Sequence, residues 1–178
     1  MDPRHLTQEQ LSAGLDRIAE SPREEGVVEM LIVRPEVNER LTPTRVEVSA
    51  ELGVHGDRWS TSPARDYPET QISLMNSRLL DLVAGSRDRW AMVGDNMIVD
   101  MDLSEATLPS GQKLAVGSAI LEITDQPHTG CKKFSGRFGA EALRFVNTGP
   151  GKEMRLRGIY ARVAQPGLIS VGDRLYKL

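Results

Sequence analysis

Residues 113–124 read KLAVGSAILEIT, a β-rich run that Gly117-Ser118 interrupts with a turn. Aliphatic and β-branched residues fill both halves, which is typical of strands. The chain then continues as DQPHTGCKKF, residues 125–134, so a glycine-containing loop directly follows the end of a strand. Such loops often carry function, because the sheet behind them holds them in place. We therefore expect a β fold that presents its chemistry in this loop.

Similar short β-rich runs recur on both sides of this segment. They occupy residues 26–33, 46–52, 71–75, 96–101, 156–164 and 171–178. Sixteen glycines and ten prolines punctuate the chain, and many short strands with such turns favour a β-barrel or sandwich over a parallel α/β sheet. We predict a mainly β protein with peripheral helices, built as a closed or partly open antiparallel β-barrel.

Three segments predict helices. The first begins at Thr7, whose spacing from Gln10 is that of a capping box, and stops at Ser21-Pro22. Residues 77–84 and 137–147 are the other two. We expect residues 1–25 to form an N-terminal helix packed on one domain, residues 26–178. Residues 60–69, with two prolines, predict a surface loop or lid.

Composition excludes several classes of protein. A chain of 178 residues has room for one domain and can bury a core without a disulfide or metal staple. Its net charge of −3 and its 4% aromatic content argue against nucleic-acid binding. No apolar run reaches the ~20 residues needed to cross a bilayer. The N-terminus lacks the pattern of a secretory signal, so we expect a cytoplasmic protein without a membrane partner.

Charge is distributed unevenly along the chain. Residues 1–127 hold 12 basic and 22 acidic side chains, a net of −10, whereas residues 128–178 hold 10 basic and 3 acidic ones, a net of +7. This asymmetry favours the last third as the place where an anion binds. The alternative is that the basic third simply packs beside the acidic part.

Cys131 is the candidate reactive group. As the single cysteine it cannot form an internal disulfide. Lys132 and Lys133 follow it and His128 precedes it by three residues, and cations near a thiol favour the nucleophilic, metal-binding thiolate. The thiolate could attack sulfur, carry it as a persulfide, or bind a soft metal. The alternative is a small, inert, buried cysteine.

Basic residues further along could hold an anion. Arg155 and Arg157 stand at alternate positions at the start of a predicted strand, so both would project to one side and match phosphate geometry. A surface salt bridge explains Arg157 as well. His128 could orient a ligand or relay a proton near neutral pH, or it could cap a turn.

Several fragments, taken in order, make the chain resemble the MOSC family, the molybdenum cofactor sulfurase C-terminal domains. The fragments are His55-Gly56-Asp57-Arg58, Gln71-Ile72-Ser73-Leu74-Met75, Gly94-Asp95-Asn96, the strand of residues 117–124, Gly130-Cys131-Lys132-Lys133-Phe134, Leu156-Arg157-Gly158-Ile159 and Gly172-Asp173. Many members have Pro-Cys where this chain has Gly130-Cys131.

The resemblance implies an antiparallel β-barrel that binds a molybdenum cofactor, the anionic pterin molybdopterin. Cys131 would carry sulfur or ligate molybdenum, and His128 would assist it. Residues at the basic loop and at the matching motifs would hold the cofactor: Lys132, Lys133, Arg137, Asn96, Asp57, Arg155 and Arg157. The reaction would be sulfur transfer, with a cysteine desulfurase as partner, or reduction of N-hydroxylated compounds, with an external electron donor. The alternative is a sulfur carrier or binding module without catalysis.

Overall fold

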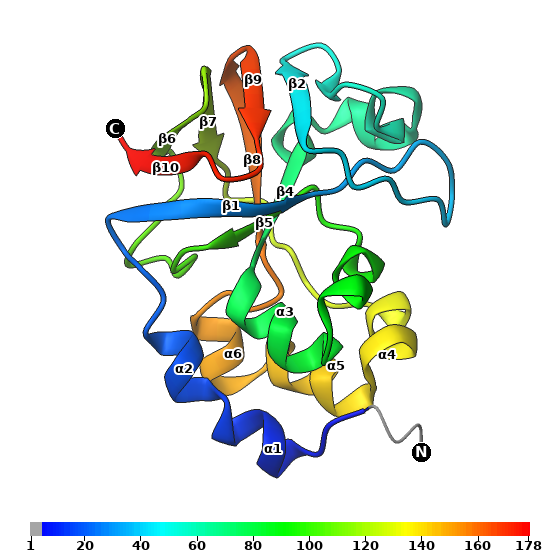
Figure 1. Ribbon diagram of the computed structural model, residues 1–178, viewed down its shortest axis with the longest axis vertical. Helices are drawn as coiled ribbons and strands as arrows, with labels where there is room; N and C mark the ends of the chain where they lie inside the picture. The colour runs from blue at the N-terminus through cyan, green and yellow to red at the C-terminus, as the bar shows by residue number, and fades with distance from the viewer. Residues whose placement is uncertain (1–4) are drawn as a thin grey trace.

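The computed structural model describes residues 5–178, and its strands form a closed barrel with a small second sheet beside it (Figure 1). Around the barrel the strand order is β1-β10-β6-β7-β8-β4-β5. These strands are β1 (Glu25–Leu31), β4 (Ile72–Asn76), β5 (Met97–Asp100), β6 (Lys113–Val116), β7 (Ala119–Ile123), β8 (Ile159–Gln165) and β10 (Arg174–Lys177). The predicted mainly β fold with a closed barrel is confirmed.

The segment of residues 113–124 forms neighbouring barrel strands, β6 and β7. Val116 pairs with Ala119, so Gly117 and Ser118 make the predicted turn. Gly117 has a φ of +56°, and a Cβ there would lie 2.1 Å from the carbonyl oxygen of Leu168. Only glycine meets both conditions, the left-handed backbone and the close approach. The turn therefore also lets the small sheet, to which Leu168 belongs, pack tightly on the barrel.

One pair of barrel strands is parallel, which differs from the expected antiparallel barrel. β4 runs parallel to β5, with Leu74 opposite Met97. Parallel neighbours need a long crossover connection. Here α3 (Ser77–Ala84) and the 3-10 helix η4 (Arg87–Val93) supply it. The sequence predicted the helix and both strands, but hydrophobic periodicity carries no information on which strands pair.

The small sheet has the order β3-β2-β9, with β2 (Arg45–Ser49), β3 (Gly53–Val54) and β9 (Gly167–Ser170). The strand predicted over residues 46–52 ends at Ser49, because the chain turns there and Gly53 has a φ of +65°. The strand predicted from residue 171 begins at Arg174 instead. Asp173 explains the delay, since its carboxylate accepts a hydrogen bond from the Ser170 amide at 2.7 Å and closes a turn.

Short helices gather at one end of the barrel (Figure 1). They are α1 (Gln8–Ala13), α2 (Leu15–Ala19), α3, α4 (Lys132–Phe138), α5 (Ala140–Asn147) and α6 (Gly149–Glu153). The Thr7 capping box is confirmed. The predicted first helix breaks at Gly14, where a Cβ would lie 2.5 Å from Leu82 Cδ2. Residues 1–4 of the expected N-terminal segment lie outside the described part of the chain.

Two further segments differ from their predictions. The helix expected over residues 137–147 is two helices, because Gly139 has a φ of +99° and separates α4 from α5. The expected loop of residues 60–69 consists of 3-10 turns: η1 (Arg58–Thr61), η2 (Pro63–Asp66) and η3 (Pro68–Thr70). No helix within residues 5–178 has the length and apolar character needed to span a bilayer.

Buried apolar side chains form two separate core clusters. The first fills the barrel with side chains such as Leu74, Val99 and Leu121. The second lies among the helices and includes Leu80, Phe134 and Phe138. Because Phe134 and Phe138 belong to α4, this second core fixes the helix that follows Cys131.

Asn76 ends β4 and caps α3 from a buried position. Its Oδ1 accepts from the Leu79 amide at 3.0 Å, and its Nδ2 donates to Ser21 Oγ and to the Met101 carbonyl at 2.8 Å. We expect Asn76→Ala to lower the free energy of unfolding by about 2–3 kcal/mol, because three buried partners lose a bond. Thr7→Ala removes an exposed cap and should cost about 0.5–1 kcal/mol. Urea unfolding measures both losses, and equal losses would contradict the role given to burial.

Candidate functional site

Cys131 is exposed and occupies the N-cap position of α4. The backbone amide of Phe134 lowers the pKa of its thiol most, and the amide of Lys133 and the guanidinium groups of Arg157 and Arg137 lower it further. Burial acts in the opposite direction but does not prevail. The pKa of the thiol therefore lies below that of an unperturbed cysteine, as the sequence led us to expect, although arginines and backbone amides are the cause rather than the lysine side chains.

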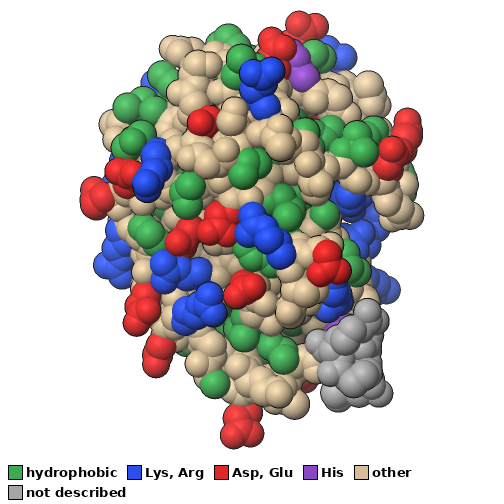
Figure 2. All heavy atoms as spheres, in the orientation of Figure 1, with side chains coloured by type: hydrophobic (Ala, Val, Ile, Leu, Met, Phe, Trp, Pro, Cys, Tyr) green, Lys and Arg blue, Asp and Glu red, His purple; other side chains and the backbone are tan. Residues whose placement is uncertain are grey.

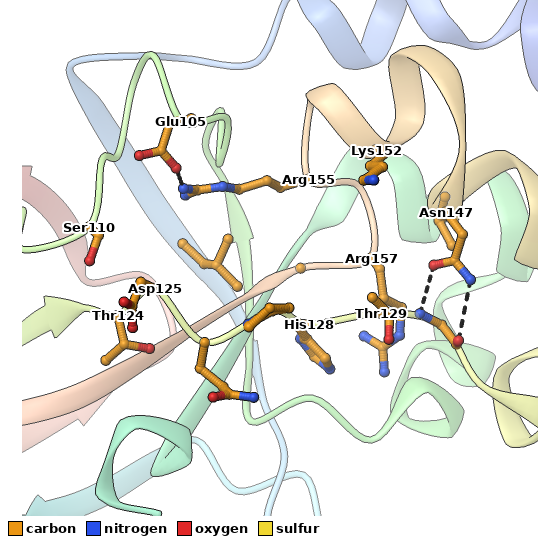
Figure 3. A pocket seen from close by; sticks show the side chains of 16 residues that line it. Glu105, Ser110, Thr124, Asp125, His128, Thr129, Asn147, Lys152, Arg155 and Arg157 are labelled. Atoms are coloured by element: carbon orange, nitrogen blue, oxygen red, sulfur yellow. Dashed lines mark hydrogen bonds and ion pairs between the residues drawn. The ribbon is translucent and has the colours of Figure 1, made fainter.

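Asn147 at the end of α5 clamps the loop that presents this thiol. Its Oδ1 accepts from the Gly130 amide at 2.8 Å, and its Nδ2 donates to the Gly130 carbonyl at 3.2 Å (Figure 3). A Cβ at residue 130 would lie 2.5 Å from Leu143 Cδ1. Proline at this position would have no amide hydrogen to donate. The Gly-Cys pair therefore belongs to a loop held by an asparagine, which a Pro-Cys pair could not use in this way.

Asp95, His128 and Arg157 form a buried group of charged and polar side chains next to this loop. Asp95 Oδ2 accepts from Arg157 at 2.8 Å, and Asp95 Oδ1 lies 3.5 Å from His128 Nδ1. The His128 ring stacks on Tyr160 with 4.2 Å between centroids. The Arg157 guanidinium lies over the Phe134 ring, with 5.3 Å between its Cζ and the ring centroid. Arg157 thereby links Asp95 to the helix that Cys131 begins.

His128 stays neutral at physiological pH. Burial lowers its pKa from 6.5 to about 4, and the charge of Arg157 adds to this effect more strongly than that of Arg34, while Asp95 opposes it. The suggestion that His128 relays a proton by titrating near neutral pH is therefore wrong. A neutral imidazole still offers one hydrogen-bond donor and one acceptor.

Arg155 and Arg157 do not project from a strand as predicted. Both lie in the turn before β8, and Arg155 has a φ of +51°. Figure 3 shows their side chains directed to different partners, Arg155 to Glu105 and Arg157 toward His128. Arg155 also donates to the Leu108 carbonyl at 2.8 Å. Because the chain turns between the two residues, the alternation rule for strands does not apply.

Four guanidinium groups form what we call the arginine cluster: Arg34, Arg40, Arg58 and Arg137. Burial lowers the pKa of Arg40, and the charges of Arg137, Arg34 and Arg58 lower it further, while Asp57 acts in the opposite direction. The cluster draws on the loop after β1, on η1 and on α4. Figure 2 shows several Lys and Arg side chains along the right edge, where these segments lie in Figure 1. So many close cations favour an anion between them.

Asp57 and Asn96 are buried next to the arginine cluster and orient Arg34. Asp57 takes two hydrogen bonds from the Arg34 guanidinium, at 2.8 and 2.9 Å, and one from Asn96 Nδ2 at 3.1 Å. Asn96 Oδ1 accepts from the Ser73 amide at 3.1 Å. The Arg34 contacts hold the pKa of Asp57 below its usual value in spite of burial. Both side chains are buried, so they hold Arg34 in place.

Four arginines of the described chain have a buried Nε atom without a hydrogen-bond partner; one of them is Arg89, and the other three belong to this site. The Nε atoms of Arg40, Arg58 and Arg157 are buried and have no hydrogen-bond partner among residues 5–178. Leaving a charged donor unpaired costs more than leaving a neutral one unpaired. Acceptors supplied by an anion would lower that cost, so the residues present fit an anionic ligand.

The predicted site residues separate into four groups. Arg137 and Arg157 lie near Cys131, and His128 lies beside Arg157 and Asp95. Asp57 and Asn96 lie next to Arg34 of the arginine cluster, and Arg155 pairs with Glu105 elsewhere. Lys132 and Lys133 are exposed on the first turn of α4. Within residues 5–178 no three His, Cys, Asp or Glu side chains gather as a metal site. A metal ligated by Cys131 would thus need its other ligands from a cofactor or water.

Sequence reasoning missed Arg34 and Arg40, and it did not select Asp95 or Arg58, although both stand in motifs quoted above. Arg34, Arg40 and Arg58 belong to the acidic part of the chain, where the net charge of −10 hid them. Arg58 could have been found, because it directly follows Asp57 in one of the motifs. No local signal marks Arg34 or Arg40 as members of an anion site.

Comparison with known proteins supports the fold and a family. A family model described as MOSC domain matches residues 49–176. The YuaD protein from Bacillus subtilis has a TM-score of 0.63 at 16% identity, over 87% of this chain and 96% of that one. YiiM from Escherichia coli has 0.56 at 16%, over 85% and 69%, and YiiM from Geobacillus stearothermophilus has 0.58 at 17%, over 86% and 75%. No curated protein matches.

The reactivity of the Cys131 thiol depends on the charges around it. We expect native Cys131 to be alkylated by iodoacetamide at a lower pH than a peptide thiol, because backbone amides and arginines favour its thiolate. Arg137→Gln should move the alkylation midpoint upward and slow the reaction at neutral pH about two- to threefold. Arg144→Gln, on the exposed face of α5, is the matched control and should change neither. Equal effects of the two variants would contradict the role of Arg137.

The lowered pKa of His128 makes the stability of the fold depend on pH. Its pKa is about 4 when folded and 6.5 otherwise, so the unfolded state binds more protons between these values. The free energy of unfolding must therefore fall as the pH drops from about 6.5 to 4. We expect His128→Gln to remove up to about 3 kcal/mol of that decrease. Urea unfolding at several pH values tests this, and parallel pH curves for the two proteins would refute it.

Proposed function

The chain belongs to the MOSC domain family, and on that basis we propose that it binds a molybdenum cofactor and uses Cys131 as the molybdenum ligand or as a sulfur acceptor. The observation that supports this most is the combination of an exposed thiol of lowered pKa with a neighbouring excess of arginines. A thiolate suits a thiophilic metal, and guanidinium groups suit a phosphate. An exposed thiol or a group of arginines alone is common in proteins. The two together match a phosphorylated pterin that carries a metal.

The arginine cluster would hold the phosphate end. Arg40 and Arg58 have buried Nε groups without an acceptor. Arg34 is already fixed by two bonds to Asp57 at 2.8 and 2.9 Å, so it is oriented before a ligand arrives. Such preorganisation lowers the entropy cost of binding. Asp57 and Asn96 are then positioning residues that orient Arg34, and Arg137 extends the cluster toward Cys131.

Cys131 would hold the metal end. The backbone amides of Phe134 and Lys133 and the charge of Arg157 lower the pKa of its thiol, which increases the fraction of the metal-binding thiolate. The bound group would supply a two-electron redox centre that the amino acids themselves lack. Asp95 keeps Arg157 in place through the 2.8 Å bond, which maintains the positive field at the thiol.

Two reactions are compatible with these roles. In reduction, an N-hydroxylated compound would take two electrons and two protons and give the amine and water, with the electrons coming from an external donor protein. In sulfur transfer, the Cys131 thiolate would attack the outer sulfur of a persulfide on a cysteine desulfurase. A new S–S bond would form on Cys131, and the partner's thiolate would leave with the electron pair of the bond that breaks.

The second candidate function is a sulfur carrier or binding module without catalysis. A module that had lost the chemistry would place Cys131 as an inert, buried residue, and the exposure of this thiol speaks against that version. The carrier version uses the same exposed thiolate and differs only in needing no bound cofactor. Cofactor content therefore separates the two.

We expect protein purified from a molybdenum-replete host to contain molybdenum and a pterin. Arg58→Gln should lower both about fivefold or more, because charge-assisted bonds to phosphate are lost. Arg65→Gln, an exposed residue of η2, is the matched control and should leave both unchanged. Cys131→Ser should lose molybdenum in preference to the pterin. Metal analysis and pterin fluorescence measure the two contents.

Other results would contradict the proposal. If the protein holds neither component after purification and reconstitution, cofactor binding is wrong. If it then gains one sulfur by mass spectrometry after incubation with a desulfurase and cysteine, and Cys131→Ser does not, the carrier function is correct instead.

A further inference from the structure

A cavity beside the cysteine loop is separate from the cofactor site proposed above, although Arg157 borders both. It has a volume of about 480 Å³ and lies between residues 124–130 and residues 155–159. Cys131 and the arginine cluster do not line it, whereas His128 and Arg157 do. A smaller cavity of about 120 Å³ contains Arg34, Arg58 and Tyr160. Because His128 stacks on Tyr160, the two rings form part of the wall between the cavities.

Asp95 determines which nitrogen of His128 carries the hydrogen. The His128 side chain is 8% exposed and the Asp95 side chain 1%. Asp95 Oδ1 lies 3.5 Å from Nδ1, and neither atom has another polar partner within residues 5–178. A carboxylate can only accept, so a neutral His128 places its hydrogen on Nδ1. This leaves Nε2 with a lone pair.

Nε2 is the ring nitrogen that a ligand can reach. It has no hydrogen-bond partner in the described chain, and it does not belong to the buried unpaired atoms, so it retains contact with solvent. His128 lines the large cavity, and Figure 3 shows its ring beside Arg157 within that cavity. The cavity therefore contains a fixed acceptor on a rigid, stacked side chain, which recognises an O–H or N–H group.

The charges in the wall indicate the other end of the ligand. Lys152 is exposed and no carboxylate of the described chain lies within ion-pair distance of it. Arg155 is paired with Glu105, and Arg157 with Asp95. Asp125 lies on the opposite side of the cavity from Lys152 in Figure 3. Lys152 is thus the one unpaired cation of the lining, and it favours a carboxylate near it.

Part of the cavity lining is apolar. Pro127, Val146 and Ile159 contribute to its walls. A few polar groups placed around an apolar lining are typical of small-molecule sites, and the volume lies within the usual range of roughly 300–1,000 Å³. The walls therefore suit a ligand with an apolar body between two polar ends.

We propose that this cavity is a second ligand site, which binds a small aromatic carboxylate bearing a hydroxyl or amino group. The carboxylate pairs with Lys152, the O–H or N–H group donates to His128 Nε2, and Asp95 is the positioning residue that keeps this nitrogen an acceptor. The site goes beyond the proposed cofactor function and does not depend on it, because neither the arginine cluster nor Cys131 takes part.

Binding of para-hydroxybenzoate to the protein without cofactor tests the site. Two matched probes each lack one feature: para-methoxybenzoate has no donor, and para-hydroxybenzamide has no charge. We expect each to bind about fivefold more weakly by calorimetry or by titration of amide shifts. Lys152→Gln should remove the preference for the charged probe and keep the preference for the donor. Lys113→Gln, exposed on β6 and outside the cavity, should keep both.

Asp95→Asn gives an outcome that a purely structural role would not produce. The new amide can donate to Nδ1, which moves the ring hydrogen to Nε2, so the preference should reverse toward the methoxy probe. If this variant does not fold, the nitrogen chemical shifts of His128 in the unaltered protein decide the tautomer, and a hydrogen on Nε2 would overturn the proposal. Equal binding of all three probes, or no binding at millimolar concentration, would also overturn it. Molybdenum content is measured separately, so either proposal can fail alone.

Discussion

The arrangement of this site depends on the hydrogen bonds that the Asp57 carboxylate accepts. It is buried, and it accepts bonds from the amide and guanidinium of Arg34, from Asn96 and from the Trp59 amide. These partners belong to the loop after β1, to the entry of β5 and to η1, which lie far apart in the chain. A buried carboxylate is costly unless its partners surround it, so these segments must meet in one arrangement. The same arrangement brings Arg40 and Arg58 beside Arg34.

A second buried carboxylate acts in a similar way on the other side of the His128–Tyr160 stack. Asp95 binds Arg157 and faces His128, and the residue after it, Asn96, bonds to Asp57. One short segment thus supports both the cationic side and the cavity side of the site. Two carboxylates hold Arg34 and Arg157, while the remaining guanidinium groups of the region stay without a buried anionic partner. Such an imbalance is stable only if solvent or a bound anion compensates it.

Much of the fold could be predicted from local pattern. The turn at Gly117-Ser118, the helix of residues 77–84 and the Thr7 cap follow from rules that act within a few residues, and they are confirmed. The failures have a common cause. Helices end at Gly14, where a Cβ would clash with Leu82, and at Gly139, which has a positive φ. The parallel pairing of β4 with β5 depends on a crossover connection. Contacts between distant segments determine these features, and hydrophobic periodicity along the chain carries no information about such contacts.

The sequence by itself determined the class of fold, indicated the family and identified Cys131 as the candidate reactive group, because a single cysteine in a glycine-containing loop after a strand is visible in one short window. The tertiary structure alone decided which cations surround it. Arg34, Arg40 and Arg58 come from the part of the chain with net negative charge, and Lys132 and Lys133, adjacent to Cys131, stay at the surface. The electric field at a site depends on distance in space rather than on separation along the chain, and burial strengthens it.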